Sequence, residues 1–541
     1  MAGPASSPAV PLFLALVFAA ASLCRGARAQ WEESDLVTTL PGQPPVGFRH
    51  FAGYVGARPG DAKELFYWFF EAEGGAGNKP LVLWLNGGRC MQQPPRSLSL
   101  SLSLSPLMNL FTNFYLDCPG CSSIAYGAAQ ELGPFLVRSN GPNLTLNAYS
   151  WNKGMHLFSL FSPGTLCCFS PYILIWRAVG AVANLLFLEA PVGVGFSYTN
   201  KTVGLEELGD RVTAQDSHAF LLNWFKKFPR FRSHDFYIAG ESYAGHYVPQ
   251  LAELIHEGNT NASRDSYINF KGFMIGNAVI NDETDQLGMV DYAWSHAIIS
   301  DQLYHAVHRD CSDFNGSATG KACSSAVKAF LQAYTDIDIY SIYTPVCLGS
   351  PSQRPKSLIK AKKILAAAPR TFSDHEFRYS MRPLPRAGYD PCTEDYVEKY
   401  FNREDVQRAL HANLTNLSYP YTPCSAVIQK WNDSPSTVLP IIRKLLDAGL
   451  RIWIYSGDTD GRVPVTSTRY SVNAMGLTVE EEWRAWYHKR QVAGWVVEYR
   501  GGLTLATLRG AGHQVPVLAP DRSLSLISHF LAGKRLPSAR R

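Results

Sequence analysis

The stretch Phe236–Gly245 reads FYIAGESYAG and decides the fold. It begins as a short apolar run typical of a buried strand and continues into small residues typical of a sharp turn before a helix. A serine on such a turn exposes its hydroxyl, and small neighbours let the backbone bend. The stretch departs from strict Gly-x-Ser-x-Gly, because Ala244 stands in the second glycine position. Taken alone, this pattern is more often a turn than a nucleophile, so Ser242 needs partners.

Two later strand ends supply those partners. IWIYSGDTDGRVP ends a strand with Asp458 and Asp460, and TLRGAGHQVP ends another with His513. A serine needs a base, and the base needs a carboxylate that orients it and stabilises the imidazolium. The chain order Ser, Asp, His, each after a strand, is the order of α/β-hydrolases. We predict Asp460 as the orienting group, because the loop must leave the strand before the carboxylate can turn to His513. Asp458 is the alternative, with a turn-capping hydrogen bond as its other role.

Apolar runs bounded by Gly, Asn or Pro recur along the chain and predict further buried strands. They are Leu81–Leu85, Asn184–Leu188, Phe236–Ala239, Phe273–Ile275, Arg451–Tyr455 and Leu503–Leu508. Helical patterns between some of them indicate an α/β-hydrolase fold with a mostly parallel central sheet. The alternation stops between Ile275 and Arg451, which predicts an inserted helical cap. The predicted domains are a signal peptide at 1–29, a first core part at 30–280, the cap at 281–440 and a second core part at 441–541.

Composition and the N-terminus address the compartment. The 541 residues carry a net charge of +5 without a basic-aromatic pattern, which argues against nucleic-acid binding. The apolar run Val10–Leu23 is shorter than the ~20 residues of a membrane span, so we interpret 1–29 as a secretory signal and predict no membrane partner. Asn-x-Ser/Thr sequons predict glycosylation in a secreted or vacuolar protein. They are Asn143, Asn261, Asn315, Asn413 and Asn416.

Several motifs together carry a family resemblance. LNGG, PGCSS, ELGP, GESYAG, APVGVGFSY, YSGDTD and GAGHQVP resemble the serine carboxypeptidase family, and similarity to its plant two-chain, type II group extends from about Asp35 to Pro537. The resemblance implies an enzyme that removes C-terminal residues from peptides and proteins with a free C-terminus, through an acyl-enzyme. It implies no metal, no organic cofactor and a tendency to form homodimers. The rivals are an acyltransferase on the same fold and a catalytically impaired protein.

The resemblance also assigns roles to residues outside the triad. The backbone N–H groups of Gly88 and Tyr243 would form the oxyanion hole. Asn86, Glu131 and Glu241 would bind the carboxylate of the substrate, and their presence favours the peptidase over the acyltransferase. Two adjacent carboxyl groups cannot both ionise cheaply, so one keeps a proton and activity should favour acid pH. Without the resemblance, Glu131 would be a helix-surface carboxylate and Asn86 a turn residue.

Side-chain preference follows from the neighbour of the catalytic histidine. Gln514 beside His513 is neutral, so we predict a preference for apolar residues near the scissile bond.

Six cysteines match the structural set of the family. The resemblance implies the pairs Cys121–Cys424, Cys311–Cys323 and Cys347–Cys392. The last pair spans the basic, Pro-rich segment 349–390, which we predict to be an exposed linker, although its middle could form a solvated helix. A processing protease that cuts this linker would leave two chains tied by the disulfide.

Two stretches depart from the family pattern. Between NGG and PGCSS the family has no insertion, but here Arg89–Cys118 intervenes and contains SLSLSLSLS, which a CT dinucleotide repeat encodes. Gly154–Ala181 interrupts the chain after SWNK. Its stretch Met155–Trp176 lacks charged residues, yet its prolines make a membrane span a poor alternative. We interpret both as retained intron sequence, which could displace Gly88 and impair the enzyme.

Overall fold

The computed structural model describes residues 32–58, 60, 62–88, 120–138, 143–153, 183–200, 203–311, 321–347 and 389–540. The predicted signal peptide, both predicted inserts, the linker up to residue 388 and the sequon Asn315 lie outside the described residues. The interpretations of these segments, like the predicted domain boundaries, therefore stay predictions.

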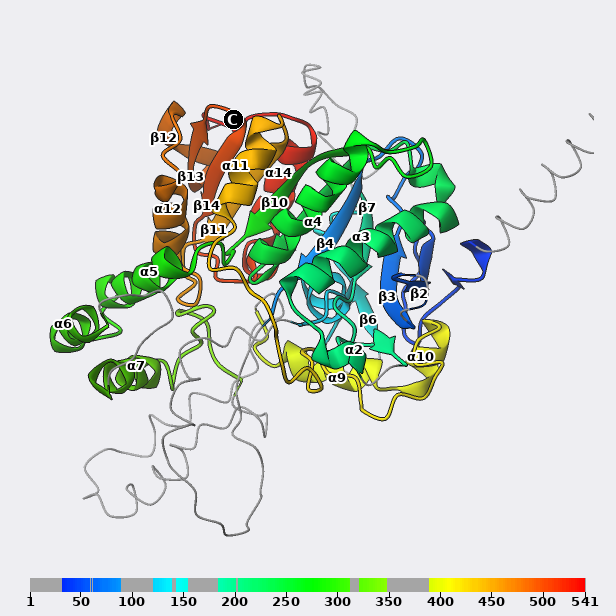
Figure 1. The fold of residues 1–541 in the computed structure, drawn as a ribbon, viewed down its shortest axis with the longest axis horizontal. Helices are drawn as coiled ribbons and strands as arrows, with labels where there is room; N and C mark the ends of the chain where they lie inside the picture. Colours follow the sequence, from blue (N-terminus) through cyan, green and yellow to red (C-terminus); the bar gives the residue numbers. More distant parts are fainter. Residues whose placement is uncertain are drawn as a thin grey trace, which may run out of the picture.

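A 12-stranded sheet forms the centre of the molecule, with the order β1-β2-β3-β7-β4-β9-β10-β11-β14-β13-β12 and β8 paired to β3 (Figure 1). From β7 to β14 neighbouring strands run parallel, and antiparallel strands flank them. The strands are β1 (Leu36–Val37), β2 (His50–Gly56), β3 (Lys63–Phe70), β4 (Leu81–Asn86), β7 (Asn184–Leu188), β8 (Tyr198–Thr199), β9 (Phe236–Glu241), β10 (Phe270–Gly276), β11 (Arg451–Gly457), β12 (Val479–His488), β13 (Gln491–Tyr499) and β14 (Leu503–Leu508). The predicted α/β fold with a mostly parallel sheet is confirmed. A separate ribbon pairs β5 (Phe135–Val137) with β6 (Leu144–Leu146).

Helices cover both faces of the sheet, which explains why its central strands are continuous apolar runs. In β4, Leu81, Leu83 and Leu85 join the core on one face, and Val82 and Trp84 join the core on the other. The first face packs against α3 (Asp210–Lys227), α4 (Ala244–Thr260), α11 (Leu439–Asp447) and α12 (Val465–Ala474). The second packs against the π-helix η1 (Ile124–Glu131), α9 (Thr393–Phe401) and α14 (Pro520–Leu531). Three short helices also pack against these cores: α2 (Val203–Glu206), η2 (Pro229–Phe231) and α13 (Val515–Leu518).

The region between β10 and α11 contains the helices of the predicted cap. α5 (Asp282–Ser295), α6 (Asp301–Asp310) and α7 (Lys321–Ala333) share a small core of their own, and Figure 1 shows them projecting from the sheet. The other described helices of this region, α9 and α10 (Glu404–Ala409), lie apart from α5–α7 in the same view, and residues of α9 enter the main core. The predicted cap thus divides into two helical groups.

Within the described residues, three disulfides bind the cap to itself and to the core. They are Cys121–Cys424, Cys311–Cys323 and Cys347–Cys392, the pairs that the resemblance implied. The last of them joins the two described ends of the linker region. Across the described ranges, no helix combines the length and apolar character of a bilayer span.

Candidate active site

Ser242 lies between β9 and α4 with a φ of +66°, in the left-handed region that a residue with a side chain rarely adopts. Its N–H donates to Gly276 O at 3.1 Å, and its carbonyl accepts from Gly245 N at 2.9 Å. A Cβ added to Gly245 would lie 2.2 Å from Val279 O, in the segment that follows β10. Small residues are therefore required around this turn, and the strained backbone presents the Ser242 hydroxyl at the end of the sheet.

The predicted imidazole and carboxylate meet at the same end of the sheet. His513 Nδ1 lies 2.6 Å from Asp460 Oδ2, and both side chains are buried. Asn277 Nδ2 also donates to Asp460 Oδ2 at 2.9 Å, and Arg462 N donates to Oδ1 at 2.8 Å. These bonds hold the carboxylate against Nδ1. The other ring nitrogen, Nε2, is then the one available to act as a base. The alternative, Asp458, accepts from Gly510 N at 2.5 Å instead, which is a turn-capping contact.

Gly87 and Gly88 approach the serine turn closely. A Cβ on Gly87 would lie 2.2 Å from Tyr243 N, so no side chain fits at this position. Gly87 N donates to Glu241 O at 3.0 Å, and Ser242 Oγ donates to Gly88 O at 3.4 Å. Ser242, His513, Gly87 and Gly88 line one pocket. The backbone around the two predicted oxyanion donors, Gly88 and Tyr243, therefore lies close to the Ser242 hydroxyl.

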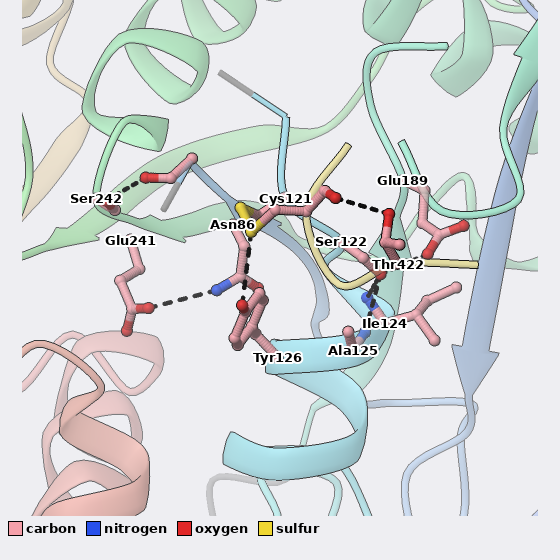
Figure 2. The surroundings of a disulfide bond; sticks show 12 residues. Asn86, Cys121, Ser122, Ile124, Ala125, Tyr126, Glu189, Glu241, Ser242 and Thr422 are labelled. Atoms are coloured by element: carbon pink, nitrogen blue, oxygen red, sulfur yellow. Dashed lines mark hydrogen bonds between the residues drawn. A yellow bond between two sulfur atoms is a disulfide. The ribbon is translucent and has the colours of Figure 1, made fainter. Parts of the chain in front are cut away.

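The three predicted carboxylate-binding residues lie together, and Figure 2 shows two of them, Asn86 and Glu241, next to each other. Asn86 and Glu241 are partners in the parallel register of β4 and β9, so both emerge at the same sheet end. Asn86 Nδ2 donates to Glu131 Oε1 at 3.1 Å and to Glu241 Oε1 at 3.4 Å. All three side chains are buried. The carboxyl groups of Glu131 and Glu241 thus share the amide of Asn86, and Glu241 directly precedes Ser242.

Burial controls the protonation of this group. It raises the pKa of Glu131 to about 7, although hydrogen bonds with Asn86 and Glu241 and the charge of His513 lower it. A carboxyl group with this pKa keeps its proton in acid and loses it near neutrality. The pair therefore carries a proton that it can donate to another carboxylate below pH 7.

Two residues that the sequence did not single out hold Asn86, one through its side-chain amide and the other through its backbone. Trp84 Nε1 donates to Asn86 Oδ1 at 2.6 Å, and Asn86 N donates to Ser123 Oγ at 2.9 Å. Because the amide oxygen accepts from an indole, the NH₂ group must point to the carboxyl groups. The spacing offered one signal, since Trp84 and Asn86 are two apart on a strand and share a face.

The disulfide Cys121–Cys424 borders the pocket (Figure 2). Cys121 N donates to Gly87 O at 2.9 Å. The neighbouring Ser122 hydroxyl donates to the buried Glu189, and it accepts from Ala125 N at 2.9 Å at the start of η1. Burial raises the pKa of Glu189 to about 7. This network attaches η1, which ends in Glu131, to the strand that carries Asn86.

The rest of the pocket wall combines three tyrosines and a leucine with polar side chains, one of them acidic. Its other lining residues are Cys121, Tyr126, Asp338, Tyr340, Ser341, Tyr389, Gln514 and Leu518. Gln514 lies in the wall, as its place beside His513 suggested. Asp338 is the lining carboxylate that sequence reasoning missed, because it belongs to the cap and no motif marks it.

The described glycosylation sequons differ in exposure. Of the described sequons, Asn143, Asn261 and Asn416 are exposed, whereas Asn413 is partly buried and donates to Gln407 Oε1 at 3.0 Å. Among the residues that the structure covers, no group of three or more His, Cys, Asp or Glu side chains is placed to hold a metal ion.

Sequence comparisons with known proteins point to one family. The serine carboxypeptidase profile matches residues 41–90, 118–165 and 176–533, and leaves 91–117 and 166–175 unmatched. Serine carboxypeptidase-like 35 of Arabidopsis thaliana is 57% identical over 515 residues, covering 94% of this chain and 93% of that protein. Serine carboxypeptidase-like 34 of the same plant is 48% identical over 514 residues, with 94% and 90% covered.

A solved structure shares the fold. It is that of Kex1, a prohormone-processing carboxypeptidase from Saccharomyces cerevisiae, with a TM-score of 0.66 and 22% identity over 93% of this chain and 96% of that one. The sequence matches and the shared fold lead to one conclusion: the chain belongs to the serine carboxypeptidase family.

Proposed function

We propose that this protein is a serine carboxypeptidase that hydrolyses the last peptide bond of peptides and proteins through an acyl-enzyme. One observation carries the proposal: Ser242, Asn86 and Glu241 line one pocket, and the buried Glu131 accepts a hydrogen bond from the same Asn86 amide. A nucleophile beside a group that binds carboxylates acts on the bond next to a free C-terminus. The acyltransferase alternative is not favoured, because it has no use for this pair.

Each step uses a group already described. Ser242 Oγ attacks the carbonyl carbon while His513 Nε2 takes its proton, since Nδ1 is held by Asp460. The N–H groups of Gly88 and Tyr243 stabilise the resulting oxyanion. His513 then protonates the leaving amine, and the C–N bond breaks. Water attacks the acyl-enzyme, His513 takes a proton from it, and Ser242 regains its own.

The first prediction concerns pH. Below pH 7 the neutral Glu131 donates to the substrate carboxylate, whereas above pH 7 the ionised pair repels it. We expect kcat/KM for a peptide with a free C-terminus to fall about tenfold per pH unit above 7. The same peptide with a C-terminal amide or ester should keep its activity there. Rates of both substrates measured from pH 4 to 9 test this.

Glu131→Gln is the matched control, because glutamine keeps a donor and does not titrate. In this variant the decline for the free peptide should disappear while the profile of the amide stays as in the wild type. A wild type in which both substrates lose activity along one curve would show that the pair does not recognise the carboxylate.

A second prediction concerns side-chain preference. Tyr126, Tyr340, Tyr389 and Leu518 favour apolar side chains near the scissile bond, and Asp338 disfavours acidic ones. In a series of N-blocked dipeptides we expect Leu and Phe to give the highest kcat/KM and Glu the lowest. Asp338→Asn should raise the value for Glu about fivefold and leave that for Leu unchanged. Lys or Arg exceeding Leu and Phe would contradict the apolar preference.

We further propose passage through the secretory pathway to the vacuole or the extracellular space. The N-terminal 1–29 segment and the sequons support this proposal. Cleavage within 349–390 would give two chains that stay joined, since Cys347–Cys392 bridges the linker. Dimer formation remains a prediction from the resemblance.

A further inference from the structure

A buried aspartate outside the proposed triad contacts the residue that follows the nucleophile. Asp210 begins α3, and its side chain is 1% exposed. Its Oδ1 accepts from Tyr243 Oη at 2.9 Å and from Trp431 Nε1 at 2.9 Å. Its Oδ2 accepts from Gln250 Nε2 at 2.8 Å and lies 2.9 Å from His246 Nδ1. The triad described above uses none of these bonds.

The hydrogen-bond directions at Tyr243 follow from the number of protons available. The carboxylate of Asp210 only accepts, so the single phenol proton of Tyr243 goes to it. Ser434 Oγ, 2.5 Å from the same phenol oxygen, must then donate to it. Tyr243 is 6% exposed, and its ring stacks on His246 with centroids 4.8 Å apart. Both the far end and one face of the Tyr243 side chain are therefore held.

Tyr243 is also the residue that follows the strained serine. Its φ of −62° and ψ of −13° begin the turn into α4, and its amide lies against Gly87. A tyrosine side chain has few rotatable bonds, so holding its hydroxyl limits the rotation of its own backbone. The segment that supplies Trp431 and Ser434 also holds α3, because Asp433 O accepts from Asp210 N at 3.0 Å. The hydrogen bonds around Asp210 thus connect the segment with Trp431 and Ser434 to the peptide group next to Ser242.

We propose that Asp210 is a positioning residue for catalysis: through the phenol of Tyr243 it fixes the direction of the Tyr243 N–H that stabilises the oxyanion. This inference rests on the proposed function, and it adds a group that acts on the transition state from outside the pocket. An oxyanion donor must be placed within about 0.5 Å to work fully. Loss of the phenol bond should therefore slow the chemical step and leave substrate binding intact.

The test compares Tyr243→Phe with Gln250→Leu in the full-length chain. The first removes the bond from the catalytic turn to Asp210, and the second removes a bond of similar length to the other oxygen of the same carboxylate. We measure kcat and KM for a peptide and an ester, the inhibition constant of a peptide aldehyde, which forms a tetrahedral adduct, and the melting temperature.

For Tyr243→Phe we expect kcat to fall about tenfold for both substrates, KM to stay within about twofold, and the aldehyde to bind about tenfold more weakly. Gln250→Leu should lower the melting temperature to a similar extent with kcat near the wild-type value. Equal kcat in Tyr243→Phe and wild type, or equal losses of kcat in both variants, would overturn the inference. Failure of the proposed function would differ, because Ser242→Ala would then match the wild type.

Discussion

Ser242→Ala is expected to leave a folded protein whose peptide and ester turnover is lower by about 10⁵-fold. The hydroxyl is the atom that would form the acyl-enzyme, and no other serine lies on the left-handed turn at the end of β9. The oxyanion donors and the carboxylate site remain, so a trace of catalysis above that of water should persist. Steady-state kinetics on a blocked dipeptide and its ester, with a thermal melt for folding, measure this. A fluorophosphonate probe should label the wild type and not the variant.

The two aspartates provide a matched comparison within the same loop. Asp460→Asn would present an amide to His513 Nδ1 and disturb its orientation and charge, so kcat should drop about 10⁴-fold. Asp458→Asn keeps an oxygen for Gly510 N and should retain most of the activity. A folded Ser242→Ala protein with near-normal turnover, or an Asp458 variant that fails as badly as the Asp460 variant, would refute the triad.

The sheet and the order of its catalytic elements could be predicted because local patterns determine them. Apolar runs such as Leu81–Leu85 are typical of strands buried on both faces, and a parallel sheet between two helical layers provides that burial. Ser242 and His513 follow strands of that sheet, so topology alone brings them to one end. The choice of Asp460 over Asp458 also followed from a backbone argument. These features depend on residues close in sequence to a strand end.

The parts that could not be predicted depend on contacts between distant segments. Trp84 orients Asn86 through a hydrogen bond whose purpose appears only beside Glu131 and Glu241. Asp338 reaches the pocket from the cap, about 100 residues after Ser242 in the chain, and no motif or periodic pattern marks it. Asp210 gathers donors from α4 and the segment before α11. A sequence pattern has no period or spacing that would reveal such meetings.

A backbone hydrogen bond joins the described residues on the two sides of each predicted insert. Gly87 O accepts from Cys121 N at 2.9 Å, and Trp151 O accepts from Ala183 N at 3.2 Å. Without residues 89–118, Cys121 would stand four residues after Gly87, and without 154–181, Ala183 would stand four residues after Trp151. Both bonds would then be ordinary i to i+4 turns. This supports the proposal that the working enzyme lacks both segments.

The effect of the first segment on catalysis is expected to be large. Gly88 is its immediate neighbour and the proposed oxyanion donor, and loss of one such donor costs about a hundredfold to a thousandfold in turnover. Loop closure costs little, because its entropy grows only logarithmically with length. The fold can therefore persist while the donor is displaced. The second segment carries Cys167 and Cys168, which can compete with the native disulfides during oxidative folding.

Removal of both segments is accordingly expected to raise turnover about a hundredfold and to raise secreted yield. The single deletions separate the two effects: loss of 89–118 should restore kcat, and loss of 154–181 should mainly improve yield and lower free thiols. Expression of the four chains through a secretory host, with peptidase kinetics and thiol titration, measures all three quantities. This split is expected because the first segment follows Gly88 directly in the sequence. Equal yield and equal kcat in all four chains would mean that both segments are tolerated surface loops, and that their interpretation as intron sequence is wrong.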